Sequence, residues 1–144
     1  MSRPTDNYIG AFSYRVWISG ISDPFDGFSK VSALTSASEP VEFKHGLDPT
    51  VRKMPGRLSY DDVTLERVYT GIDAFSEWRR RVEAGVEDPR VVTIELRHAN
   101  REVLRRVILT EAWPVDWHLP EMDAGTSSMA IEAFTLNFGS AMLD

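Results

Sequence analysis

The sequence contains no cysteine, which excludes disulfides, thiolate zinc sites and cysteine nucleophiles. It also lacks any apolar run approaching the roughly 20 residues that a membrane-spanning helix needs, and no apolar core of a signal peptide follows Arg3. Basic residues are few, since 16 of them against 22 acidic residues leave a net charge of -6. A general nucleic-acid binder needs a basic surplus to displace counterions. We therefore expect a protein that is made in the cytoplasm without a signal peptide and does not insert stably into membranes.

The usual catalytic and ligand-binding motifs are also missing. The three histidines, His45, His98 and His118, lie far apart and show no metal-ligand spacing. No metalloprotease, EF-hand, phosphate-loop, dinucleotide-binding or serine-hydrolase motif occurs. Asp61 and Asp62 are neighbours on an expected strand, where consecutive side chains point to opposite faces. Because we find no catalytic, cofactor-binding or metal-binding residue, we expect a protein that is not an enzyme and needs no cofactor.

Strand patterning dominates what is present in this chain of 144 residues, a length that suits one domain with its own core. Residues 12–19 alternate, with Trp17 on an otherwise polar face and an apolar face made of Phe12, Tyr14, Val16 and Ile18. A long loop is expected over residues 114–128. Further extended segments are expected at about residues 28–36, 41–45, 58–69, 90–98, 103–113 and 129–138. The segments at 90–98 and 103–113 are expected to form a hairpin.

One α-helix is expected at about residues 72–84. Thr70 and Asp73 fit a capping box at its start. Gly85 can end it, because glycine readily adopts the left-handed conformation common just beyond helices. The apolar stripe at helical spacing consists of Ile72, Phe75, Trp78 and Val82. The whole pattern predicts a mainly β fold, a barrel or sandwich of antiparallel strands with one flanking helix.

A basic segment, "VRKMPGR" at residues 51–57, lies within a loop expected over about residues 46–57. A solvated loop that keeps a sheet edge from aggregating is one interpretation. Phosphate binding is disfavoured, because the glycines stand only at the loop margins and no helix start follows to complete a nest of amides. Trp17 also has two interpretations, since a tryptophan on a wet strand face either covers a second layer or meets another subunit.

Several segments, in order, resemble the tail tube proteins of contractile phages and of phage-derived contractile injection systems. The resemblance spans nearly the whole chain, and the order and spacing of six landmarks make it much more specific than "MPGR" alone. The segments are "FSYRVWISGI" with "GFSKVSAL", "VEFKHG", "VRKMPGR", "YDDVTLERV", "FSEWRRRVEAG" and "EAWPVDWHLPEMDAGTSSMAIEAFTLNF".

The resemblance implies one tail-tube domain over residues 1–144, with a β-barrel-like body of two packed antiparallel sheets. Six copies would form a ring, and rings would stack into a hollow rigid tube that a contracting sheath drives through a target envelope. The implied partners are further copies, the sheath protein, a spike or baseplate hub, a terminator, and cargo or DNA in the lumen. No cofactor is implied.

In the family the long loop contacts neighbouring subunits, which implies an assembly loop here at about residues 46–57. Its acidic contacts would come from Asp48, Asp61 or Asp62, and Trp17 is a candidate interface aromatic. The candidate interface residues of the loop are Arg52, Lys53, Met54, Pro55, Gly56 and Arg57.

Three alternatives stay open. Some injection systems carry a tube-initiator ring protein on the spike hub, but this chain shows no obvious insertion, which favours the main tube subunit. The hexameric tube protein of type VI secretion shares the fold, although "MPGR" and "EAWPVDW" look closer to the phage and injection-system branch. From a different class, a monomeric β-barrel could bind a ligand between inward aromatics such as Phe12 and Tyr14. Either a phage genome or a bacterial chromosome could encode such a subunit.

Overall fold

The computed structural model describes residues 13–44, 46–47, 49–98, 100, 102–121, 124–125 and 130–144. These ranges hold one helix and nine strands, so the predicted mainly β fold is confirmed. In chain order the elements are β1 (Ser13–Ile18), β2 (Phe25–Val31), β3 (Ser36–Phe43), β4 (Arg52–Tyr60), β5 (Val63–Val68), α1 (Ala74–Glu83), β6 (Arg90–Arg97), β7 (Val103–His118), β8 (Ile131–Asn137) and β9 (Ser140–Leu143).

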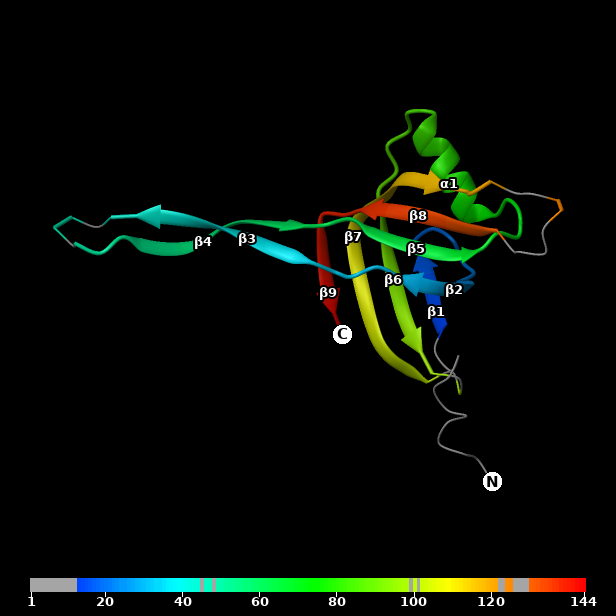
Figure 1. The fold of residues 1–144 in the computed structure, drawn as a ribbon, viewed down its shortest axis with the longest axis horizontal. Helices are drawn as coiled ribbons and strands as arrows, with labels where there is room; N and C mark the ends of the chain where they lie inside the picture. Colours follow the sequence, from blue (N-terminus) through cyan, green and yellow to red (C-terminus); the bar gives the residue numbers. More distant parts are fainter. Residues whose placement is uncertain are drawn as a thin grey trace, which may run out of the picture.

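Six strands close into an antiparallel barrel. Their order is β6-β1-β2-β5-β8-β7, and β7 pairs with β6 to complete the circle. Closure removes the free edges that an open sheet would expose. β9 lies outside the circle, on the edge of β7, while β3 and β4 form a separate two-stranded sheet. Figure 1 shows this second sheet projecting from the barrel.

The barrel core follows the period-2 alternation of the strands. On β5, Val63 and Leu65 are buried, and Leu65 lies opposite Phe134 of β8. On the other side of the barrel, Val16 of β1 lies opposite Ile94 of β6. The predicted apolar face of the first strand is therefore confirmed over the described residues. The buried apolar residues are Val16, Ile18, Phe28, Val63, Leu65, Phe75, Trp78, Val92, Ile94, Leu109, Ala112, Phe134, Leu136 and Phe138.

The helix α1 packs against the barrel through Phe75 and Trp78, as predicted. Phe75 stacks on Phe134 with ring centroids 4.1 Å apart. The helix ends as expected at Gly85, which has φ of 89°. The backbone amide of Gly85 donates to the carbonyl of Val82, and that of the next residue donates to Arg81, which satisfies the last carbonyls of the helix.

The start of the helix differs from the prediction. Asp73, and not Thr70, is the N-cap, and its carboxylate accepts a hydrogen bond from the backbone amide of Ser76 at 3.1 Å. Ile72 precedes the helix and is 60% exposed, so it does not belong to the apolar stripe. The capping motif was misplaced because Asp73 caps the helix directly and leaves no role for a hydroxyl three residues earlier.

Several strand boundaries also differ from the prediction. The segment expected at 28–36 is divided between β2 and β3, and β3 begins well before residue 41. β7 continues through Pro114 to His118 and pairs there with β8, so the loop expected from residue 114 begins later. β6 pairs with β7 only as far as Ala112, so that edge of β7 has no partner at Pro114 among the described residues. A proline is tolerated there because the backbone amide that it lacks has no hydrogen bond to make. The segment expected as one strand over residues 58–69 is divided between β4 and β5 at Asp61 and Asp62.

Candidate assembly surfaces

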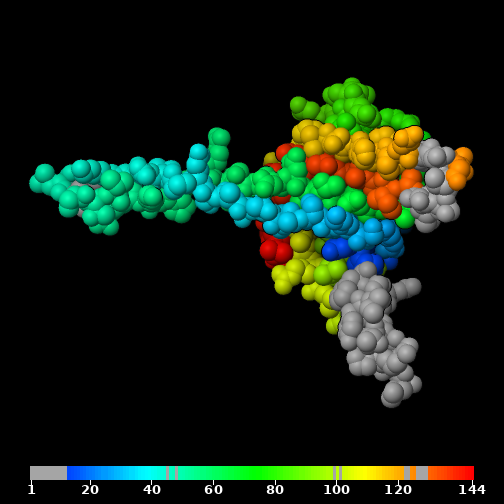
Figure 2. Space-filling view, in the orientation of Figure 1, coloured from blue at the N-terminus to red at the C-terminus, as the bar shows by residue number. Residues whose placement is uncertain are grey.

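We call strands β3 and β4 the arm. The expected loop at residues 46–57 is largely part of it, because β4 begins at Arg52. Every residue of β3 is exposed, and among the described residues the two strands pair only with each other. Figure 2 shows the arm extending away from the barrel as a narrow projection. A two-stranded hairpin is at best marginally stable in water by itself.

The distal half of the arm has an apolar side and a charged side. Val41 lies opposite Met54 in the strand register, and both are about half exposed. Glu42 lies opposite Lys53 on the other side, with carboxylate and ammonium 3.9 Å apart. Both of these side chains are about two-thirds exposed, so the pair contributes little stability. Phe43 continues the apolar side.

The Pro-Gly step of the basic segment gives the arm its shape. Pro55 lies opposite Pro40, and the register shifts just beyond this pair. Because neither proline offers an amide, this part of the hairpin resists pairing with a further strand. Gly56 occupies the shift, where a Cβ atom would lie 2.5 Å from Cγ2 of Val41 and 2.6 Å from the carbonyl oxygen of Glu39. The close approach of the strands therefore requires glycine.

The three cations of the basic segment do not share one side of the arm. Arg52 and Lys53 are consecutive in β4 and so point to opposite sides, and Arg57 follows near the register shift. Of the three expected acidic contacts, Asp61 and Asp62 lie at the base of the arm, where Asp62 accepts a hydrogen bond from Asn137. Asp48 lies outside the described residues.

Trp17 is tied into a polar network on the barrel surface while remaining 37% exposed. Its indole Nε1 donates to Glu95 at 3.0 Å, and Glu95 also pairs with Arg106 at 3.1 Å. Arg106 in turn pairs with Asp144 at 3.0 Å, and hydrogen bonding to Glu95 and then Asp144 raises the pKa of its guanidinium. This network links β1, β6 and β7 to the last residue of the chain. Both interpretations of Trp17 remain compatible with it.

A buried ion network that the sequence analysis missed joins the barrel to the helix. Arg67 is 6% exposed and Glu132 is fully buried, and the guanidinium Nε lies 2.9 Å from the carboxylate. Arg67 also pairs with Asp73 at 2.8 Å, and Trp117 donates to Glu132 at 2.8 Å. Burial alone lowers the pKa of Arg67, but the hydrogen bonds to Asp73 and Glu132 outweigh it and raise the pKa.

The Arg67 guanidinium sits among aromatic rings and not in water. Its central carbon lies between 5.2 and 6.0 Å from the ring centroids of Phe25, Phe28, Phe75 and Phe134. The alternation that buries Val63 and Leu65 also points Arg67 inward, two residues further along β5. Extending that pattern would have indicated from the sequence that Arg67 points inward, although not which residue pairs with it.

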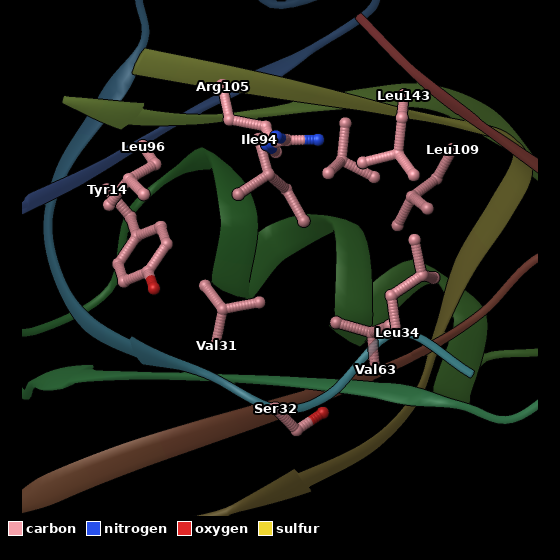
Figure 3. Close-up of a pocket in the computed structure, with 11 residues that line it drawn as sticks. Tyr14, Val31, Ser32, Leu34, Val63, Ile94, Leu96, Arg105, Leu109 and Leu143 are labelled. Atoms are coloured by element: carbon pink, nitrogen blue, oxygen red, sulfur yellow. The ribbon is translucent and has the colours of Figure 1, made fainter. Parts of the chain in front are cut away.

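One end of the barrel holds an apolar cavity of about 340 Å³. Figure 3 shows side chains of β1, β2, β6, β7 and β9 facing it, with Arg105 among them. Tyr14 lines this cavity, as the ligand-binding alternative expects, whereas Phe12 lies outside the described residues. Within the described ranges no cluster of acidic or histidine side chains could hold a metal ion, and no helix is long and apolar enough to cross a membrane.

A closed β-barrel with one flanking helix and a projecting arm is the architecture of a structural tube protein. The chain belongs to the T4-like virus tail tube protein gp19 family, whose model matches residues 10–141. No curated protein sequence matches the chain significantly.

Solved structures of contractile systems share the fold. A chain in the anti-feeding prophage baseplate is 20% identical, with a TM-score of 0.73 over 100% of this chain and 97% of that one. A chain in the extended sheath-tube complex of the extracellular contractile injection system PVC is 21% identical, with a TM-score of 0.74 over 91% of this chain and 87% of that one. Hcp1 from Flavobacterium johnsoniae is 15% identical, with a TM-score of 0.62 over 91% and 94%.

Proposed function

We propose that this protein is the main subunit of the inner tube of a contractile tail or injection system, with six copies in each ring and rings stacked into a hollow tube. The arm is the observation that carries this proposal. It exposes an apolar side formed by Val41, Phe43 and Met54, which its own barrel does not cover. Exposed apolar surface of this kind marks a contact with another molecule. Family membership makes other copies of the chain the natural partner.

The arm and the barrel present different surfaces, so a contact that runs in one direction from copy to copy is heterologous. Such contacts generate rings when the rotation closes and filaments when it does not. Residues 52–57 of the arm, together with Trp17 on the barrel, form the proposed contacts between subunits. The sheath would surround the tube, a spike or baseplate hub and a terminator would hold its ends, and cargo or DNA would occupy the lumen. Support for these partners comes from the similar chains in baseplate, sheath-tube and terminator structures.

The test is negative-stain electron microscopy of the purified protein over a range of concentrations, with Arg52→Glu/Lys53→Glu as the variant. We expect rings and tubes from the natural sequence and few or none from the variant. The matched control is Lys30→Glu, which reverses an exposed charge on β2. Unchanged assembly of the double variant would refute the role of the arm. If the natural protein forms tubes only after a hub complex is added, the tube-initiator alternative is excluded for this chain, because an initiator would add a ring to the hub and not a tube.

A second candidate function rests on the barrel-end cavity, whose volume lies at the lower limit of small-molecule pockets. A ligand-binding barrel would remain monomeric, since its site needs no second copy. Light scattering at high protein concentration, with and without an added hub complex, separates the two candidates, because only the tube subunit gains mass.

A further inference from the structure

We propose that the arm of one copy docks into a groove of a second copy, between the end of helix α1 and the bend of β7. This helix-end groove has a volume of about 540 Å³. Its lining includes Val82, Val86, Glu87, Pro89, Glu111 and Trp113. The inference rests on the proposed function for its setting and adds the site that receives the arm.

The walls of the groove are apolar and its free charges are acidic. Val82, Val86 and Trp113 supply apolar surface, and Val86 is 48% exposed. Asp88 also lines the groove, but it is committed to Arg90 at 2.8 Å and Arg81 at 3.3 Å. Glu87 and Glu111 enter no salt bridge among the described residues, so their carboxylates are available to a cationic partner.

A local distortion places Glu111 at the groove. Its backbone has φ of 52°, which no other described non-glycine residue shares in sign. Such a conformation is strained for a residue with a side chain and persists only where the surrounding structure holds it. Gly139 leaves room for the Glu111 side chain, because an added Cβ there would lie 2.9 Å from a carboxylate oxygen of Glu111. The fold thus maintains a strained residue whose side chain lines the groove.

The arm has the complementary charge. Residues 36–60 carry four basic and three acidic residues, while the rest of the chain carries 12 basic and 19 acidic residues. The projecting part therefore has a small positive excess, although the chain as a whole is acidic. Its apolar side matches the apolar wall, with Met54 able to adapt its shape to an irregular surface. Arg52, which lies on the same side of the arm as Met54, can then pair with Glu87 or Glu111 of the groove.

We take the occupant from a second copy because in this structure the arm extends away from its own groove (Figure 1). In Figure 1 the arm and the helix project from the barrel in different directions. Arm and groove are different surfaces of one chain, so a contact that runs in one direction can propagate from copy to copy, whereas a reciprocal exchange of arms would close as a two-fold dimer.

The natural absence of cysteine permits a direct test by disulfide trapping. Met54→Cys and Val86→Cys variants, one carrying a mass tag, are mixed and oxidised mildly, and mixed dimers are quantified on a non-reducing gel. The control pair is Met54→Cys with Met142→Cys, because Met142 on β9 is 62% exposed. We expect at least about five times more mixed dimer from the groove pair than from the control pair. Equal yields, or more from the control, would overturn the proposal.

A charge exchange tests the groove separately. Adding Arg52→Glu to the Met54→Cys variant should lower the trapped yield up to about fivefold, the limit for one exposed ion pair. Adding Glu87→Lys to its partner should then restore the yield, and a failure to restore it would remove Glu87 from the contact. If tubes form but the groove pair is not trapped selectively, the groove contact is refuted and the proposed tube function stands. If the groove pair is trapped selectively but no rings or tubes form, the groove contact is supported and the proposed tube function is refuted.

Discussion

Replacing Glu132 by alanine should destabilise the isolated subunit more than any surface change. Glu132 is fully buried and accepts hydrogen bonds from Arg67 at 2.9 Å and Trp117 at 2.8 Å. The substitution leaves a guanidinium that is 6% exposed with only Asp73 as a charged partner. It also leaves the indole N–H of Trp117 without its acceptor.

Removing one partner of a buried ion pair costs about 3–5 kcal/mol, because the other charge remains desolvated. Asp73 still neutralises part of the Arg67 charge, so we expect about 3 kcal/mol for Glu132→Ala. This is a large share of the roughly 5–15 kcal/mol that stabilises a typical domain. In thermal unfolding it corresponds to a decrease in Tm on the order of 10 °C.

Urea unfolding of the dilute protein, followed by circular dichroism and tryptophan fluorescence, measures this cost. The control is Glu66→Ala, which removes a carboxylate from the same barrel but breaks only an exposed pair with Lys30. That control should cost no more than about 1 kcal/mol. A loss below about 1 kcal/mol for Glu132→Ala would show that the buried pair does not stabilise the junction of helix and barrel. Arg67→Met/Glu132→Leu should recover most of the loss, since four phenylalanine rings surround the site.

Three further predictions concern the helix start, the arm and the barrel surface. Burial raises the pKa of Asp73, but hydrogen bonds from Arg67 and Ser76 outweigh burial and hold this pKa below its usual range. The stability that ionised Asp73 contributes is therefore complete above pH of about 4 and is lost as the pH falls through the lowered pKa of the folded state. Asp73→Asn should therefore flatten the acid limb of a stability-against-pH curve, and an unchanged limb would contradict this assignment. Gly56→Ala should distort the arm and reduce tube assembly in a pelleting assay while changing Tm little, because the arm lies outside the barrel core. Trp17→Ser should weaken assembly, whereas a loss of subunit stability alone would show that Trp17 only covers the Glu95 network.

The strands and the helix were largely predictable because local periodicity records them. Val63 and Leu65 alternate with polar neighbours, and Phe75 and Trp78 recur at helical spacing. Gly85 marks the helix end through its own conformational freedom. These signals depend on a few adjacent residues, so the chain carries them before any tertiary contact forms. Acidic balance and the absence of catalytic motifs likewise needed no structure.

The inward positions of the two charged residues in the ion network could have been predicted from the sequence, but they were not. Arg67 and Glu132 occupy inward positions of alternating strands and lie directly opposite each other in the register. A charged residue at the end of an apolar alternation normally suggests that the strand has left the core. Only the closed barrel shows that each charge is buried with the other, because their pairing joins residues 65 positions apart.

The arm was decided by tertiary structure. Proline and glycine at residues 55 and 56 indicate a loop by local rules, yet here they shape a hairpin in which Pro55 faces Pro40. The sequence by itself determined which residues seek a core and that the chain builds a β domain, because hydrophobic spacing is a local property. The tertiary structure decided which surfaces remain uncovered. The arm, the helix-end groove and the barrel-end cavity each combine residues from separate elements, and no local pattern records how those elements meet.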